Sequence, residues 1–351
     1  MEQSYDITKT YQENYDRGPR LSELSEAVPE TPEKVLFGVP LRSRLGIAAG
    51  LLLNSKWIEA YAQRGFDLLT YKTVRSSYRP CYPLPNWVFV DEDSGAVGPV
   101  RLREEPPQDP EKVSSAVCFG MPSMAPEVWR ADVSRAKQAL GWGQMLFVSV
   151  VATPRDGWGR AEMAADFACC AAWAAESGAD VVEANFSCPN VCTAEGSIYL
   201  DPELSRDICR SIRDRLGTTP LVLKVGYFED DEVLRATLTV VASWVDGITL
   251  VNGMTRPVLK RDGQPVFGET FTHAGVLGRS IHEASVRSVA SARSYVDREK
   301  LSLRLLAVGG ASVVSDIEDF FSVGADAVLM GSSPMYQSEL AMEAKKAHPE
   351  W

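Results

Sequence analysis

Two carboxamides, a hydroxyl and a thiol lie close together in one short segment of the chain. They are Asn185, Ser187, Cys188 and Asn190. Carboxamides both donate and accept hydrogen bonds, and a thiol becomes a proton acceptor once it ionises. The set therefore suits holding a planar, amide-rich ring and removing one of its protons.

This polar segment leaves a short apolar strand. Val181 and Val182 are β-branched, which favours a strand, and Pro189 cannot continue a central ladder. The strand predicted over 180–187 is one of eight. The others are predicted at 45–50, 66–74, 145–152, 220–228, 247–252, 303–308 and 325–330.

Amphipathic segments alternate with these strands and predict eight helices. Eight strand–helix units in about 300 residues predict an α/β fold, a closed (β/α)8 TIM barrel, with an open doubly wound sheet as the alternative. In such a barrel the chemistry lies at the carboxyl ends of the strands. The helices are predicted at 54–65, 127–140, 160–178, 202–216, 230–243, 281–299, 314–324 and 335–347.

Two segments depart from this rhythm. Residues 1–36 are polar, acidic and interrupted by prolines, so we expect an N-terminal extension with a helix around 20–27, before a barrel over 37–351. Residues 79–113 are too long for a tight connection after the second strand. We expect this insertion to contain a hairpin near 87–100 and to lie over one end of the barrel, near the active site.

Lysines end two of the apolar strands. Lys72 precedes Thr73 at the end of the second strand, and Lys224 ends the fifth. Lysine is rarely buried without a partner. The alternatives are a side chain that reaches solvent at a strand end, or a cation beside an electron-rich cofactor ring or an anionic intermediate.

Small residues end three further strands. Ala48, Ala49 and Gly50 follow the first strand, where absent side chains let a flat ligand approach the backbone. The seventh strand ends in Gly309-Gly310 and the eighth in Gly331-Ser332, and each opens a helix. Backbone N–H groups at helix N-termini on the last two strands predict a phosphate site.

Other chemistries are less well supported by the sequence. Seven cysteines, an odd number, do not indicate a disulfide framework, and Cys188 alone could be a small buried hydrophobe. Cys192 lies four residues after Cys188, but no Cys/His pair matches them, so we expect no metal site. His273, in the glycine-rich stretch 267–278, is expected to be a loop residue.

The bulk composition excludes several classes of partner. The formal net charge of −11 argues against nucleic acid or an anionic membrane. No run approaches the roughly 18 apolar residues of a membrane span, and the first residues lack the features of a signal peptide. The expectation is a cytoplasmic enzyme.

The segment Asn185-Phe-Ser-Cys-Pro-Asn190 resembles the Asn-Leu-Ser-Cys-Pro-Asn motif of the dihydroorotate dehydrogenase family of FMN enzymes. It resembles the form with a cysteine base used by the soluble class 1 members; class 2 carries serine there and a lipid-facing N-terminal helix. The resemblance extends to three further segments, Tyr71-Lys-Thr73, Leu223-Lys-Val225 and Val308-Gly-Gly310. It runs from about Val39 to Tyr336.

The resemblance implies a role for each residue of the motif. Cys188 would take a proton from a ring carbon of the substrate while a hydride passes to flavin N5, with Ser187 and Lys72 also catalytic. Asn185, Asn190, Asn252 and Lys72 would contact the substrate. FMN would be bound by Ala48, Ala49, Gly50, Lys72, Thr73, Asn185, Lys224, Gly253, Gly278, Gly309, Gly310, Gly331 and Ser332.

Three positions depart from the family pattern. Val117 stands where a substrate-binding asparagine is expected, Gly253 stands where the family has serine or threonine, and Asn86 replaces an arginine. Valine would leave a polar group of the ligand unpaired, at about 1–3 kcal/mol. A shift of the alignment could instead give this role to Ser114 or Ser115, but not to an asparagine.

We therefore predict an FMN-dependent oxidoreductase acting on CH–CH bonds, with (S)-dihydroorotate of pyrimidine metabolism as the leading substrate. The alternatives are a divergent member with another cyclic amide in a specialised pathway, a non-catalytic flavin-binding protein, or a barrel that binds another phosphate compound. A separate electron acceptor or partner subunit is expected, and a homodimer is compatible with the sequence.

Overall fold

A closed barrel of eight parallel strands forms the centre of the computed structural model, which describes residues 3–24, 26–91, 98–187 and 197–351. This is the predicted TIM barrel. Neighbouring strands pair in the order in which they occur along the chain, and the last pairs with the first. The strands are β3 (Leu45–Ile47), β4 (Leu68–Val74), β8 (Met145–Val150), β9 (Val181–Asn185), β10 (Leu221–Lys224), β11 (Gly247–Leu250), β14 (Arg304–Val308) and β15 (Ala327–Met330).

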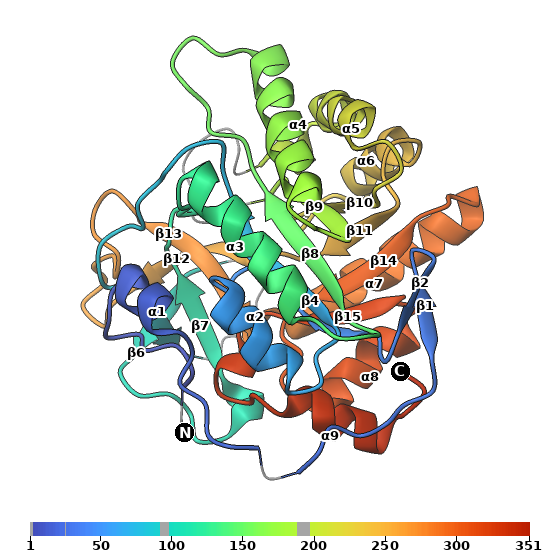
Figure 1. The fold of residues 1–351 in the computed structure, drawn as a ribbon. Coiled ribbons are helices and arrows are strands. Elements are labelled where there is room, and N and C mark those ends of the chain that lie inside the picture. Colours follow the sequence, from blue (N-terminus) through green and yellow to red (C-terminus); the bar gives the residue numbers. More distant parts are fainter. Residues whose placement is uncertain (1–2, 25, 92–97, 188–196) are drawn as a thin grey trace.

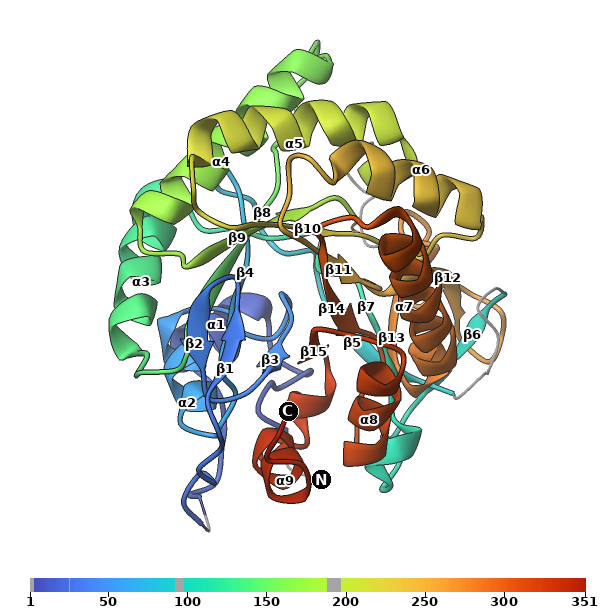
Figure 2. The ribbon, with the colours of Figure 1, turned by 90° about the vertical axis from the view of Figure 1, so that its right-hand side faces the viewer.

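A helix follows each strand of the barrel, and Figure 2 shows these helices arranged around the strands. Local signals set where they begin: the side chain of Asn54 caps α2, and Asp201 caps α5 immediately before Pro202. The helices are α2 (Ser55–Ala62), α3 (Pro126–Ala139), α4 (Arg160–Glu176), α5 (Pro202–Leu216), α6 (Asp231–Val241), α7 (Arg279–Glu299), α8 (Val314–Ser322) and α9 (Leu340–Ala347). The helix predicted over 335–347 is shorter, because 333–335 form a separate 3-10 turn.

The amino end of the barrel is closed by a small hairpin. Strands β1 (Lys34–Leu36) and β2 (Val39–Leu41) pair antiparallel, and Phe37 lies at their turn. The Phe37 ring packs on Phe147 of β8, with centroids 6.4 Å apart, and the hairpin leucines join the same apolar cluster as the inward side chains of the barrel strands. The hairpin therefore covers this end of the barrel.

A buried ion pair lies near the same end. Lys345 Nζ donates to Asp67 Oδ2 at 2.7 Å, and Ser43 Oγ donates to the same oxygen at 2.6 Å. The two charged side chains are 1% and 0% exposed. Burial raises the pKa of Asp67 and lowers the pKa of Lys345, while their mutual attraction opposes both shifts. The pair ties the last helix to the second barrel strand.

A second, smaller sheet of five strands lies at the other end of the barrel, where Figure 1 shows it beside α1. The predicted hairpin is confirmed, since β5 pairs antiparallel with β6. His273, expected to be a loop residue, instead begins a strand over 273–278. The five strands are β5 (Trp87–Val90), β6 (Val100–Arg103), β7 (Ser114–Val117), β12 (Met254–Leu259) and β13 (His273–Gly278), and they close on themselves.

The N-terminal helix lies earlier than predicted. The prediction of a helix around 20–27 was wrong; α1 spans Tyr11–Arg17 and begins at a capping box between Thr10 and Glu13. The rings of Tyr5 and Tyr11 are buried against Phe119, with centroids 5.8 and 5.7 Å away. The first residues therefore pack on the small sheet. Within the described ranges, no helix combines the length and apolar character needed to cross a membrane.

Candidate active site

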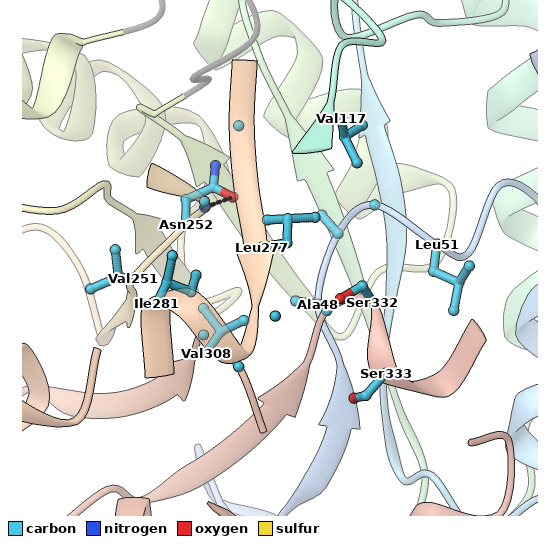
Figure 3. A pocket seen from close by; sticks show the side chains of 18 of the residues that line it. Ala48, Leu51, Val117, Val251, Asn252, Leu277, Ile281, Val308, Ser332 and Ser333 are labelled. Atoms are coloured by element: carbon cyan, nitrogen blue, oxygen red, sulfur yellow. Dashed lines mark hydrogen bonds between the residues drawn. The ribbon is translucent and has the colours of Figure 1, made fainter. Parts of the chain in front are cut away.

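A cavity of about 950 Å³ opens at the carboxyl ends of the barrel strands, between the barrel and the small sheet (Figure 3). The loops after seven of the eight strands and three strands of the small sheet contribute to its wall. Most predicted site residues line it: Ala48, Ala49, Gly50, Lys72, Thr73, Val117, Asn185, Lys224, Asn252, Gly253, Gly278, Gly309, Gly310, Gly331 and Ser332.

Three predicted residues are not among those lining the cavity. Cys188 and Asn190 lie outside the described residues. Ser187 is described and buried, and its hydroxyl faces Gly226, where an added Cβ would lie 2.6 Å from Oγ. Its N–H donates to Asn185 Oδ1 at 3.2 Å, and its carbonyl accepts from Asn252 Nδ2. In this structure Ser187 thus organises two asparagines from behind the wall.

The floor of the cavity combines small residues with a buried cation. Lys224 is 2% exposed, and its Nζ donates to the carbonyl of Ala49 at 3.2 Å. Beside it, Asn185 Nδ2 donates to Thr73 Oγ1 at 3.2 Å. A Cβ added to Gly50 would meet no atom within 4 Å. The floor therefore leaves room for a flat ligand and places a positive charge at its edge.

The glycine-rich ends of β14 and β15 fit a phosphate group. Within the described residues, the N–H groups of Gly310, Ala311 and Ser332 donate no hydrogen bond. Gly310 has φ +82°, and a Cβ there would lie 2.6 Å from the carbonyl oxygen of Gly278, so glycine is required. Asp316 accepts from the N–H of Ser312 at 2.8 Å and fixes the loop. Unpaired backbone donors in the loops after β14 and β15 suit an anion.

A second group of unpaired donors lies in the turn after β7. The carbonyl groups of this turn accept hydrogen bonds from residues outside it. The carbonyl of Phe119 accepts from the N–H of Tyr82 at 3.1 Å, and the carbonyl of Met121 accepts from Arg75 Nε at 3.0 Å. The N–H groups of Phe119, Gly120 and Met121 donate to no acceptor in the described chain. Gly120 and Met121 both have positive φ, of 73° and 51°. Successive amides in such a turn form a concave anion site.

Lys72 lies next to this turn. Its Nζ is 4.9 Å from the centroid of the Phe119 ring and 5.5 Å from that of Tyr11, so the N-terminal helix contributes to the surroundings of the lysine. The Cys81 thiol is also nearby. Burial raises the pKa of Cys81 to about 11, although the charge of Lys72 acts in the opposite direction. Cys81 therefore stays a neutral thiol near pH 7.

The wall opposite the barrel is apolar. Val117 pairs with Trp87 of β5 and with Gly275 of β13, and Leu277 lies two residues farther along β13, so their side chains share one face of the small sheet. All four residues line the cavity. In Figure 3 Leu277 extends into the middle of the space, between Asn252 and Val117.

Several lining residues were not predicted from the sequence. Those on the small sheet were missed because that sheet was not predicted and His273, at the start of β13, was expected to be a loop residue. Alternation along β7 and β13 is the signal that would have identified this face. Among the residues missed are Leu51, Trp87, Phe119, Met121, Val251, Gly275, Leu277, Ile281, Val308, Ala311, Ser312 and Ser333.

Comparison with known proteins identifies the family. The dihydroorotate dehydrogenase family model matches residues 148–346, more than half of the chain. Dihydroorotate dehydrogenase of Dictyostelium discoideum is 31% identical over 358 residues, covering 97% of this chain and 95% of that protein. The chain belongs to the dihydroorotate dehydrogenase family. The resemblance inferred from the motifs is thereby confirmed, and the chain is an oxidoreductase of the kind that acts on CH–CH bonds.

Other members of the dihydroorotate dehydrogenase family match less of the sequence. The catalytic subunit of dihydroorotate dehydrogenase B (NAD(+)) from Staphylococcus carnosus is 27% identical over 167 residues, 46% of this chain and 52% of that protein. Among solved structures, the dihydroorotate dehydrogenase of Eimeria tenella in complex with ferulenol superimposes with a TM-score of 0.74 at 16% identity, over 96% of this chain and 89% of that one. This last likeness confirms the fold.

Proposed function

We propose that the protein is an FMN-dependent oxidoreductase that oxidises (S)-dihydroorotate or a related cyclic amide. One observation carries the proposal: a single cavity joins two groups of unpaired backbone donors, one after β14 and β15 and one after β7. The first suits the phosphate of FMN, and the second suits a carboxylate of the substrate. The floor between them, with Lys224 at its edge, suits the flavin ring.

The residues of the chain fit FMN at both ends. Gly310, Ala311 and Ser332 would donate to the phosphate, and the ring would lie on the backbone of 48–50. Lys224 would stabilise negative charge that develops on the ring during reduction. When bound, the flavin accepts a hydride from the substrate carbon.

The proton acceptor in this proposal is Cys188, which follows the end of β9 directly after Ser187. Its thiolate would take the proton from the carbon next to the one that loses hydride. Lys72, across the cavity, would favour the ionised thiol and hold the substrate anion beside the turn at 119–121. Asn185 and Asn190 would bind the amide edge of the ring, with Ser187 holding Asn185 in place.

The test uses Cys188→Ala with Cys169→Ala as control, because Cys169 lies on α4, away from the lining residues. We expect the purified protein to show flavin absorbance bands. Dihydroorotate alone should bleach these bands by reducing the flavin, and an artificial acceptor should restore them by reoxidising it. Cys188→Ala should keep the flavin and lose about 10²–10⁴-fold in turnover, while Cys169→Ala should not. A colourless protein would refute the FMN assignment, and unchanged turnover in Cys188→Ala would refute the base.

We keep a divergent member with another cyclic substrate as the second candidate, because Val117 and Leu277 make one wall apolar. A non-catalytic flavin protein is disfavoured, since Lys72 and Lys224 both line the cavity. We further propose a cytoplasmic enzyme of pyrimidine metabolism with a separate electron acceptor. The reduced protein would be titrated with candidate acceptors while reoxidation of the flavin is measured by absorbance. The acceptors that reoxidise the flavin would identify the acceptor class.

A further inference from the structure

We infer that the natural substrate is a cyclic acid whose ring presents a hydrocarbon edge, rather than a carbonyl and an N–H, to the wall formed by Val117 and Leu277. The inference rests on the proposed function and narrows its substrate class. The inferred substrate has two chemically different parts. The end near Lys72 carries a carboxylate, as in dihydroorotate, whereas the edge that faces the small sheet is apolar.

The Val117 and Leu277 side chains carry no hydrogen-bonding group. On the same face, the Trp87 indole N–H and the Ser115 hydroxyl are buried and have no partner within the described chain. Val117, Gly275 and Leu277 line the cavity from β7 and β13, and Trp87 extends the same face on β5. Val117 is 6% exposed, so the structure leaves little room for water between it and a bound ligand.

Serines on β7 do not replace the missing group. Ser115 pairs directly with Leu277, but it is not among the residues that line the cavity. The Ser114 hydroxyl accepts from the N–H of Ser280 at 3.0 Å and is thereby held at the start of α7. Neither the Ser114 nor the Ser115 hydroxyl is presented to a ligand. Neither serine can therefore replace the asparagine that the family pattern has at the position of Val117.

Gly253 and Leu277 form an interlocked pair. A Cβ added to Gly253 would lie 2.6 Å from Leu277 Cδ2 and 3.1 Å from the carbonyl oxygen of Val276. Leu277 therefore occupies the space that a serine or threonine side chain at 253 would need. Leu277, and not a side chain at position 253, fills this part of the cavity, so the apolar character of the wall depends on the two positions together.

Asn252 is largely engaged by its own loop. Its Oδ1 accepts from the N–H of Gly253 at 3.0 Å, and its Nδ2 donates to the carbonyl of Ser187. These bonds fix the carboxamide next to Leu277 and occupy one donor and one acceptor position. They also explain how Asn252 keeps its orientation without a neighbouring hydroxyl.

A polar ring edge placed against Val117 and Leu277 would lose its hydrogen bonds to water and gain none from these two side chains. The expected penalty is about tenfold to a hundredfold in affinity. A hydrocarbon edge loses nothing and gains apolar contact with Val117 and Leu277. The carboxylate is unaffected, because the N–H groups of 119–121 and Lys72 lie elsewhere in the cavity.

The test compares two planar acids by isothermal titration calorimetry on the purified protein, whose flavin bands are recorded first. One is orotate; the other is 6-oxo-1,6-dihydropyridine-2-carboxylate, which keeps the lactam and the carboxylate but has CH groups in place of the imide N–H and the second carbonyl. We expect the pyridone acid to bind at least about tenfold more tightly than orotate.

Variants of the wall should reverse this preference. Val117→Asn should strengthen the binding of orotate relative to the pyridone acid by about tenfold. Gly253→Ser should act in the same direction only when combined with Leu277→Ala, which makes room for the serine side chain. Val35→Asn is the matched control, because Val35 is 61% exposed on the hairpin at the other end of the barrel; its ratio should stay unchanged.

The outcomes separate the inference from the proposed function. A yellow protein that binds orotate as tightly as the pyridone acid, or neither acid, overturns the inference alone. A colourless protein that still prefers the pyridone acid overturns the FMN proposal alone. A preference that Val117→Asn fails to change also overturns the inference.

Discussion

Two glycines in the same barrel have opposite surroundings. A Cβ added to Gly46 of β3 would lie 2.2 Å from the carbonyl oxygen of Leu68 and 2.7 Å from Leu329 Cδ2, whereas a Cβ added to Gly331 after β15 would meet nothing within 4 Å. Gly46 belongs to the filled part of the barrel and Gly331 to the cavity. The absence of a side chain serves packing in one case and leaves space for a ligand in the other.

The same contrast holds for polar groups. Near the amino end, Asp67 is bonded to both Lys345 and Ser43, and the hairpin of β1 and β2 covers the barrel. At the carboxyl end of the described barrel, several backbone donors are left without acceptors. Buried donors without partners are costly, so the group of them around the cavity indicates that a ligand completes them. The amino end of the barrel thus contributes mainly to stability, and the carboxyl end contains the candidate ligand site.

The largest expected effect lies at the filled end. Lys345→Met should lower the free energy of unfolding by about 3–5 kcal/mol, because it leaves the Asp67 carboxylate buried without its counter-charge. Chemical denaturation measures the loss. Lys346→Met, whose lysine is 48% exposed, is the control and should change stability little. Below its melting temperature the Lys345 variant should bind FMN normally; weakened binding there would break the proposed separation of the two ends.

The next effect lies at the open end. Gly331→Leu should fold with nearly unchanged stability but lose FMN affinity by more than about a hundredfold, because the new side chain enters the ligand space. Flavin released on dilution, measured by its fluorescence, gives the affinity. Gly46→Ala should do the reverse, losing about 1–3 kcal/mol or more of stability from overpacking while each folded molecule keeps its flavin. Equal behaviour of the two variants would contradict the comparison.

The smallest effect concerns Cys81. Its folded-state pKa is raised to about 11, so the neutral thiol is the favoured form. The associated stabilisation is present below the ordinary thiol pKa and is lost as the pH rises toward 11. Alkylation of Cys81 should therefore remain slow below about pH 9. Turnover of Cys81→Ser should keep the wild-type pH profile; a shifted profile would make Cys81, rather than Cys188, part of the proton transfer.

Much of the barrel could be predicted from the sequence because its strands and helices carry local signals. Pro202 after Asp201 marks the start of α5, and the predicted and observed bounds of that helix agree. The small sheet was harder, because β12 pairs with β6 and β13 with β7, each about 160 residues away along the chain. Such pairing depends on tertiary contacts, which a local pattern does not contain.

The candidate site divides in the same way. Residues at barrel strand ends, such as Lys72, Lys224 and Gly310, could be assigned because the barrel topology fixes where each strand end lies. Leu277 could not, because its importance depends on its contact with Gly253 across two strands. Neither could Tyr11, since the helix was expected about ten residues later and the contact with Lys72 joins the start of the chain to the second strand.

The packing of the first residues also has a consequence for the order of events during folding. The N–H of Ser4 donates to the carbonyl of Met335 at 2.8 Å, and Tyr61 bonds both Ser4 and the carbonyl of Pro334. Ser4 therefore contacts residues 334–335, directly after Ser333 of the cavity wall, so this contact can form only once the last barrel strand has been synthesised. Cofactor capture should then be among the last steps of maturation, so that flavin fluorescence reports on completely folded molecules and not on partly synthesised ones.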